Sequence, residues 1–314
     1  MKKYLINISL FTIPFILYFF IILSVDPFNY FNISKIISYD LKNEISNKTH
    51  YQLWKILDFE NNPSPNIVLG DSRAARLTSE LLLELTGKEY KNLAYGGGYL
   101  KEAIETFWLA DEKVKLKNVY MGVNFNLYSD NELRNLVQDV KSIKKNPFNY
   151  VFNKITFKAL YRILYSLITN NEKDYEKPQM NKEDFWKYQL TTTTKRYYSN
   201  YKYPEKLYRE MQNIAEYCNI NEIKLVIFIA PTHTDLQEEI NKYDLYTDYK
   251  KFLYDMISLN VTVFNFNIKN EFNKDTAMYG DPFHLYDYTP IVKELFLETD
   301  SLEYGEIISY AKNY

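Results

Sequence analysis

NIVLGDSRAARL, residues 66–77, joins a short apolar run to a glycine and a polar turn. The apolar run predicts a strand that ends at Gly70, and RLTSELLLELTG behind it predicts a helix that Gly87 closes. Ser72 then stands at the start of a helix, where free backbone N–H groups and the helix dipole favour a developing negative charge. Asp and Ser are also common helix N-caps, so this stretch alone indicates either a reactive hydroxyl or a capping residue.

Strand and helix patterns alternate through much of the remaining chain. Further strands are expected at 90–98, 118–125, 224–231 and 261–267, and helices at 99–112 and 288–302. Such alternation indicates an α/β fold in which helices cover both faces of a parallel sheet. Ligands bind beyond the carboxyl ends of the strands in sheets of this kind, and each candidate functional segment follows a predicted strand.

A second polar segment, GDPFHLYDYTP at residues 280–290, contains Asp281 and His284. Their spacing of three residues would bring both side chains to the same side of one helical turn, and Pro282 suits the first turn of a helix. A carboxylate can hold the imidazole in one tautomer while the other ring nitrogen takes a proton from Ser72. The pair also fits an ordinary Asp–His pair on the protein surface.

Two glycine- and asparagine-containing segments, NLAYGGGYL and MGVNFNLYS, follow the second and third predicted strands. A glycine lets the backbone approach a ligand closely and direct an N–H at it, although a tight turn explains the glycines equally well. The backbone N–H groups of Ser72 and Gly97, together with the side-chain amide of Asn124, would form a three-donor oxyanion hole.

Taken in order, these segments resemble the four signature blocks of the SGNH (GDSL-like) hydrolases. The resemblance implies a flavodoxin-like three-layer parallel sheet, the SGNH hydrolase fold, and a serine esterase or O-acyltransferase activity. It makes Ser72 the nucleophile and Asp281 and His284 its partners. The residues that carry the resemblance are Gly70-Asp71-Ser72, Asn92 with Gly96 and Gly97, Gly122-Val123-Asn124, and Asp281-Pro282-Phe283-His284.

Two blocks depart from the family pattern. Ala94 stands where a glycine is common, which makes Gly97 the preferred oxyanion donor and Gly96 the reserve. Phe125 stands where an aspartate usually follows the asparagine, so Asn126 is an alternative to Asn124 as the amide donor.

The N-terminus predicts a membrane anchor. Lys2 and Lys3 precede an uncharged apolar run over residues 4–25, which is about the length that crosses a bilayer. No small-residue cleavage site follows, and the lysines place the N-terminus in the cytoplasm. The expected organisation is a transmembrane anchor at 1–25, a juxtamembrane connector at 26–62 and an extracytoplasmic domain at 63–314.

A long segment at about 129–204 separates the third and fourth predicted strands. It predicts a largely helical insertion, either a lid or substrate platform over the site or a pair of helices that extends the core. The anchor and the insertion resemble envelope acyl-transfer proteins of the superfamily, namely the D-alanyl-transfer protein of the lipoteichoic acid pathway and alginate O-acetylation proteins. That resemblance implies a membrane-bound O-acyltransferase as partner.

The composition of the chain argues against several classes of function and of bound group. A net charge of −2 lacks the basic excess of a nucleic-acid binder. The single cysteine, Cys218, excludes an intrachain disulfide and is expected to be a buried thiol between a helix and a strand. No metal-ligand spacing or phosphate-binding glycine loop is present, so no metal or cofactor is expected. Arg73 and His233 are candidate substrate contacts, with a solvated helix residue and a helix-terminal histidine as the respective alternatives.

The sequence thus predicts serine-dependent acyl transfer or ester hydrolysis on an acylated cell-envelope glycan or polymer. The alternative is a non-catalytic protein of the same fold that binds glycan or docks onto a membrane acyltransferase.

Overall fold

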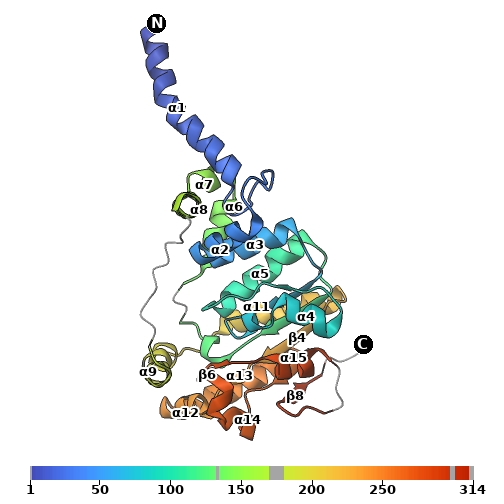
Figure 1. Cartoon of the computed structure of the whole chain (residues 1–314). Coiled ribbons are helices and arrows are strands. Elements are labelled where there is room, and N and C mark those ends of the chain that lie inside the picture. The colour runs from blue at the N-terminus through green and yellow to red at the C-terminus, as the bar shows by residue number, and fades with distance from the viewer. Residues whose placement is uncertain (1, 132–133, 170–179, 298–300, 311–314) are drawn as a thin grey trace. The chain divides into compact units, whose positions relative to one another are not determined.

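The computed structural model describes the chain except residues 1, 132–133, 170–179, 298–300 and 311–314, and except the side chains at positions 2, 5, 6, 8 and 9 (Figure 1). The chain forms two compact units. Unit 1 comprises Met1–Asn62 and Leu136–Lys177, and unit 2 comprises Pro63–Asn135 and Pro178–Tyr314.

Unit 2 is built on a six-stranded sheet in the order β2-β1-β3-β4-β5-β8. The first five strands in this order are parallel to their neighbours, and β8 pairs antiparallel with β5 at the edge. The predicted mixed α/β architecture with a mostly parallel central sheet is confirmed. The strands are β1 (Asn66–Leu69), β2 (Lys91–Asn92), β3 (Asn118–Gly122), β4 (Lys224–Ile229), β5 (Thr262–Asn265) and β8 (Glu306–Ser309).

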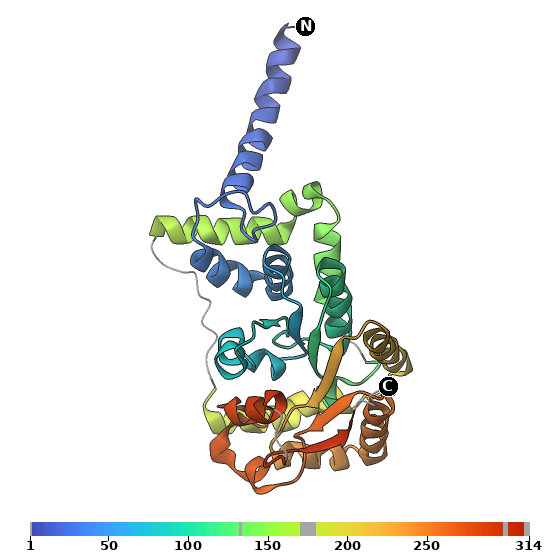
Figure 2. The same cartoon turned by 90° about the vertical axis from the view of Figure 1, so that its right-hand side faces the viewer.

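Helices lie on both sides of this sheet (Figures 1 and 2). Along each strand, successive side chains point to opposite faces, and both faces are buried because helices cover them. The helices of unit 2 are α4 (Ser79–Thr86), α5 (Leu100–Lys113), α9 (Lys182–Tyr188), α10 (Thr194–Tyr198), α11 (Glu205–Ile220), α12 (Thr234–Lys242), α13 (Tyr246–Ser258), α14 (Glu271–Lys274) and α15 (Thr289–Phe296).

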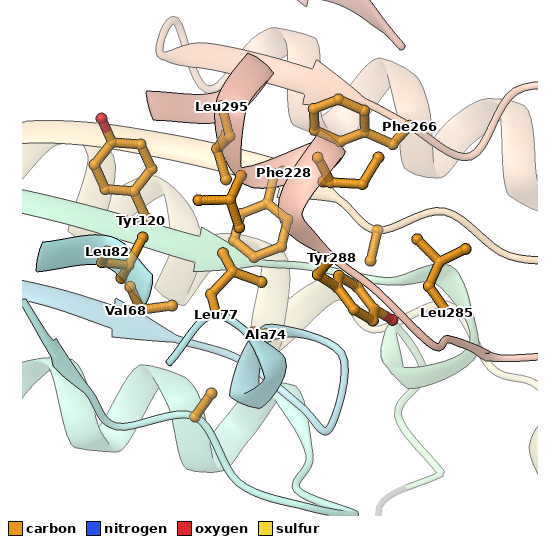
Figure 3. Packing of buried hydrophobic residues seen from close by; sticks show 14 of the residues in the cluster. Val68, Ala74, Leu77, Leu82, Tyr120, Phe228, Phe266, Leu285, Tyr288 and Leu295 are labelled. Atoms are coloured by element: carbon orange, nitrogen blue, oxygen red, sulfur yellow. The ribbon is translucent and has the colours of Figure 1, made fainter. Parts of the chain in front are cut away.

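One face of the sheet carries a continuous apolar core. Val68, Tyr120 and Phe228 come from neighbouring strands and pack against Leu82 of α4 and Leu295 of α15 (Figure 3). All five side chains are at most 4% exposed. This packing fixes the strand ends, and therefore the loops at the carboxyl edge, in one arrangement.

The predicted helix and strand around Cys218 are confirmed. Cys218 lies near the end of α11, three residues after the buried Ala215, and β4 begins at Lys224. The thiol is 1% exposed, and burial raises its pKa to about 12. A buried, protonated thiol of this kind is inert.

Among its described residues, unit 1 contains helices joined by loops and no strand. The long insertion divides: its first part joins the N-terminal segment in unit 1, while its second part belongs to unit 2. The segment expected as a connector, residues 26–62, contains the helices α2 and α3, and Leu53, Trp54, Ile56 and Leu57 of α3 are buried. The helices are α1 (Lys2–Val25), α2 (Tyr39–Thr49), α3 (Tyr51–Asn61), α6 (Leu136–Lys144), α7 (Pro147–Val151) and α8 (Lys154–Thr169).

A buried aspartate organises the chain where α1 ends. The Asp26 carboxylate accepts hydrogen bonds from the backbone N–H groups of Tyr30, Phe31 and Asn32 and from the hydroxyl of Tyr150. These four bonds hold the turn after α1 against α7, which contains Tyr150.

α1 is continuous through Pro14, and large apolar side chains along it are exposed, including Phe11 at 71% and Phe20 at 60%. Across the described residues, no helix combines the length and the apolar character needed to cross a membrane. The anchor expected at 1–25 stays a prediction, and Met1 lies outside the described residues.

Candidate active site

The first predicted site residue, Ser72, lies in the turn that leaves β1. Gly70 has φ +138°, and a Cβ there would lie 2.8 Å from the Ala74 Cβ and 2.9 Å from the Gly122 carbonyl oxygen. Glycine is therefore required at position 70, because any side chain would collide with the neighbouring strand and turn.

The helix expected directly after Ser72 is wrong. Only a 3₁₀ turn, Ala74–Arg76, follows, and α4 begins at Ser79 with Thr78 as its N-cap. The Thr78 hydroxyl accepts a hydrogen bond from the Leu81 N–H, so the strongest capping residue lies six positions beyond Ser72. A helix dipole consequently does not act on Ser72 as the sequence suggested.

Asp281 and His284 lie in a β-hairpin rather than on a helical turn. They are register partners across β6 (Tyr279–Asp281) and β7 (His284–Leu285). The Phe283 N–H donates to the Asp281 carboxylate at 2.9 Å and closes the turn. The prediction that both side chains share one side is confirmed, but the reason is cross-strand pairing, and Pro282 sits in the tight turn instead of a helix.

The three side chains form a continuous hydrogen-bonded line. The Ser72 Oγ lies 2.7 Å from the His284 Nε2, and the His284 Nδ1 lies 2.8 Å from the Asp281 carboxylate. Because an ionised carboxylate only accepts, Nδ1–H donates to Asp281, and Nε2 is left to accept from the serine hydroxyl. Ser72 and His284 are partly exposed, whereas Asp281 is buried. This geometry is that of a general base poised on a nucleophile.

A buried ion pair supports the turn that carries Ser72. The Arg73 guanidinium donates from Nε to the Asp71 carboxylate at 3.0 Å, and both side chains are at most 5% exposed. Burial alone would raise the pKa of Asp71, but the charge and hydrogen bonds of Arg73 hold its pKa below the usual range. The alternative that Arg73 is a solvated helix residue is wrong, because its guanidinium is buried against Asp71 and Asn126. Its role as a substrate contact stays a prediction, and Arg73 lines the pocket described below.

The asparagine amides are arranged differently from the expectation. The Asn124 side chain accepts from the Ala230 N–H at 3.0 Å and donates to the Asp71 carboxylate at 3.2 Å, so it links two strand ends. The Asn126 side chain accepts from Arg73 at 2.7 Å and lines the pocket beside Ser72. The geometry therefore favours Asn126, whose Nδ2 donor has no partner among the described residues, as the amide that faces a ligand.

Gly97 also lies where the sequence predicts. It lines the same pocket and has φ +66°. The neighbouring Gly98 N–H donates to the Tyr95 carbonyl, and no backbone acceptor is paired with the Gly97 N–H among the described residues. Gly97 thus remains the preferred backbone donor over Gly96, which does not line the pocket.

The pocket over Ser72 has a volume of about 240 Å³. One wall comes from the second part of the insertion, where a π-helical segment (Gln189–Thr193) lies between α9 and α10. π-segments are rare and occur frequently at functional sites. The pocket is lined by Asp71, Ser72, Arg73, Gly97, Gly98, Asn126, Leu127, Gln189, Thr193, Arg196, Tyr197, Phe283 and His284.

The platform interpretation of the insertion therefore fits its second part. Sequence reasoning missed Gln189, Thr193, Arg196 and Tyr197, because the π-segment interrupts the 3.6-residue period that reveals a helix. The cluster TTTTKRYY carried no other signal.

Two arginines lie in or beside the lining of the pocket. Arg196 lines it, with its guanidinium near the Tyr197 ring, and Arg134 donates to the Gly97 carbonyl at 3.4 Å. Neither arginine has a carboxylate partner among the described residues.

His233 plays a structural part. It is 3% exposed and caps α12, with its Nδ1 accepting from the Asp235 N–H and its Nε2–H donating to the Lys274 carbonyl. Its backbone N–H donates to the Pro282 carbonyl and so supports the hairpin. Both ring nitrogens are occupied, which fits the helix-terminal alternative and not a substrate contact.

Among the described residues, no group of three or more His, Cys, Asp or Glu side chains is arranged to hold a metal ion. No protein-family model matches this chain, and a search of curated proteins found no match either.

Proposed function

We propose that this protein is a serine-dependent acyl-transfer enzyme, either an O-acyltransferase or an esterase, that works through an acyl-serine intermediate. The observation that carries the proposal is the hydrogen-bonded line from the Ser72 hydroxyl through His284 to the Asp281 carboxylate. The resemblance of its four sequence blocks to the SGNH hydrolases, with their flavodoxin-like sheet, supports the same proposal.

In the first half-reaction, the Ser72 oxygen attacks the carbonyl carbon of an ester or thioester while His284 Nε2 takes its proton. The imidazolium that forms is stabilised by the Asp281 carboxylate on the other ring nitrogen. As the tetrahedral intermediate collapses, His284 returns the proton to the leaving alcohol or thiol. An acyl ester on Ser72 remains.

In the second half-reaction, His284 takes a proton from the acceptor hydroxyl, which attacks the acyl-serine. Collapse of the second intermediate returns the proton to Ser72 and releases the acylated acceptor. Water as acceptor gives hydrolysis, and a sugar hydroxyl gives transfer.

Negative charge on the carbonyl oxygen would be stabilised by the backbone N–H groups of Ser72 and Gly97 and by the side-chain amide of Asn126. Asn126 takes the place that the sequence pattern gives to Asn124, because the Asn124 amide already bonds to Asp71 and Ala230. Loss of one such donor typically lowers turnover by about 10²–10³-fold.

The proposed substrate is an acylated cell-envelope glycan or polymer. This part rests on the lysines and the apolar run at the N-terminus, which favour an anchored chain with its catalytic unit outside the cytoplasm. The resemblance to envelope acyl-transfer proteins adds a membrane-bound O-acyltransferase as the proposed partner. A reporter fused after Tyr314 should be active only outside the cytoplasm, and cytoplasmic activity would overturn this location.

A serine-reactive fluorophosphonate probe tests the enzymatic proposal. The folded wild type should be labelled, and Ser72→Ala should not. Ser79→Ala is the matched control, since Ser79 is a partly buried serine at the start of α4, and it should be labelled like the wild type. Equal labelling of wild type and Ser72→Ala would leave the non-catalytic alternative, a binding or docking protein of the same fold.

A further inference from the structure

Helix α8 of unit 1 has two apolar faces. One is buried within the unit through Thr156, Ala159, Leu160 and Ile163. The other is exposed through Phe157 at 56%, Tyr161 at 49% and Ile168 at 82%. Residues at spacings of four and seven share one helix face, so these three exposed side chains form an apolar stripe along α8.

The short helix α7 extends the exposed apolar surface. Phe148 and Phe152, four residues apart, are 74% and 57% exposed. Large aromatic side chains are costly to expose to water, and contiguous patches of them mark interaction sites. We call Phe148, Phe152, Phe157, Tyr161 and Ile168 the α7–α8 surface.

Contacts within unit 1 attach the α7–α8 surface to helix α1. The Tyr18 hydroxyl donates to the Val151 carbonyl at 2.7 Å, and the Tyr18 ring lies 6.1 Å from that of Phe152 and 6.4 Å from that of Phe157. In Figure 2, α8 runs across the lower end of α1. Helix α1 exposes further large apolar side chains, such as Phe15 and Phe20.

The charge pattern of this segment is one-sided. Residues 145–169 contain Lys145, Lys154, Lys158 and Arg162 and no aspartate or glutamate, although the whole chain has a net charge of −2. Lys154 and Lys158 are exposed and lie next to the apolar stripe on α8. An aromatic and aliphatic face flanked by basic residues is typical of helices that lie in the surface of a lipid bilayer.

We propose that the α7–α8 surface lies in the headgroup region of an anionic lipid bilayer, with its aromatic side chains in the acyl boundary and Lys154 and Lys158 at the lipid phosphates. Basic residues close to an anionic leaflet are attracted to it, while long lysine side chains reach outward from an apolar face. The proposal concerns a helix parallel to the membrane, so it holds whether or not α1 crosses the bilayer, and it is independent of the proposed enzymatic activity.

A second copy of the chain fits this surface less well. In a two-fold symmetric contact the same patch meets itself, which would bring the basic residues of one copy against those of the other. Like charges facing each other oppose association, whereas anionic lipid neutralises them.

An environment-sensitive fluorophore tests the proposal in the full-length protein reconstituted into phosphatidylglycerol-containing vesicles. The fluorophore is attached to Phe157→Cys in a Cys218→Ala background, which leaves one reactive thiol. Glu44→Cys is the matched control, because Glu44 is an exposed residue on helix α2 of the same unit, 52% exposed at its side chain. Circular dichroism melting of each variant shows that unit 1 stays folded.

The proposal expects the label at position 157 to be quenched several-fold more by lipids spin-labelled near the headgroup than the label at position 44, and to be protected from aqueous iodide. Lys154→Gln with Lys158→Gln should weaken the lipid quenching. Equal iodide access at both positions would overturn the proposal. Protection from iodide without lipid quenching, accompanied by cross-linking between copies or to another protein at position 157, would show a protein interface instead and would also overturn it.

Discussion

The two units differ in the kind of group that departs from ordinary burial. In unit 2 a carboxylate and a guanidinium, Asp71 and Arg73, are buried next to Ser72, although charged groups are rarely buried unless paired. Unit 1 also buries charge, at Asp26 and Lys42, but it differs from unit 2 in exposing phenylalanine side chains, among them Phe148 and Phe157. The buried charges of unit 2 support the turn that carries Ser72, whereas the exposed phenylalanines of unit 1 are available to contact a lipid surface. Under the two proposals above, unit 2 carries the chemistry and unit 1 contributes to attachment.

The largest effect on turnover is expected from substitution of Asp281, the carboxylate that hydrogen-bonds to His284. Asp281→Asn should lower turnover of an activated ester by about 10⁴-fold, because the amide no longer holds the His284 tautomer that accepts the serine proton. Steady-state kinetics measure this effect. Asp287→Asn is the control, since Asp287 is an exposed carboxylate three residues beyond His284, and comparable losses in both variants would contradict the assignment.

The second effect is on stability. Arg73→Leu leaves the Asp71 carboxylate buried without its cation, which should lower the free energy of unfolding of unit 2 by about 3–5 kcal/mol. Urea unfolding followed by hydrogen exchange in unit 2 measures the change. Arg76→Leu, at an exposed arginine of the same turn, should change it by no more than about 0.5 kcal/mol. Equal effects of the two substitutions on the free energy of unfolding would contradict a stabilising role for the buried Asp71–Arg73 pair.

The Asp71–Arg73 pair also makes the stability of unit 2 depend on pH. The native pKa of Asp71 lies below its usual value because Arg73 outweighs burial, and the unfolded pKa is about 3.9. The ionised carboxylate therefore stabilises unit 2 above the unfolded pKa, and this stability is lost as pH falls through the lower native pKa. In Asp71→Asn this acid-dependent loss should be smaller than in the wild type, and an unchanged acid transition would contradict it.

A smaller effect distinguishes the two asparagines. Asn126→Ala should lower turnover by about 10²–10³-fold with little effect on KM, because its donor acts on the developing oxyanion. Asn124→Ala should chiefly lower thermal stability, since Asn124 joins the Asp71 carboxylate to the Ala230 backbone. The opposite result would be that Asn124→Ala lowers turnover with unchanged thermal stability while Asn126→Ala leaves turnover unchanged. That result would make Asn124, and not Asn126, the oxyanion donor.

The smallest effect is expected in unit 1. Phe157→Ser should change the free energy of unfolding by no more than about 0.5 kcal/mol, because the side chain is exposed. Phe107→Ser, at a fully buried phenylalanine of unit 2, provides the contrast and should be strongly destabilising, as deletion of a buried phenylalanine side chain costs about 3–5 kcal/mol. Thermal melts of both variants check this, and a large loss for Phe157→Ser would show that α8 is covered within the protein.

The parallel sheet could be predicted from the sequence because its strands are short apolar runs between turns. β3 and β4 appear where NVYMG and KLVIFI predict them. β8 was not predicted, since EIIS follows the last helix with no neighbouring pattern, and its place at the sheet edge depends on pairing with β5. The long segment was predicted only as an insertion, and its division between two units depends on tertiary contacts that no local pattern encodes.

The sequence predicted which side chains of the candidate site come together better than it predicted the local structure that holds them. Ser72, Asp281 and His284 do come together, but through a hairpin and a 3₁₀ turn instead of the two helices expected. A spacing of three residues is compatible with both a helical turn and a tight hairpin, so sequence alone does not separate them. The structural role of Asn124 could not be predicted from the sequence either, because it depends on which backbone N–H the folded chain brings beside the Asn124 amide.

The most direct measurement is the mass of the intact protein after rapid mixing with an activated acyl ester and acid quench. We predict one added acyl group, mapped by peptide digestion to Ser72, and none in Ser72→Ala. An adduct of equal amount in Ser72→Ala, or turnover of the ester by wild type with no acylated Ser72 at any time, would contradict it.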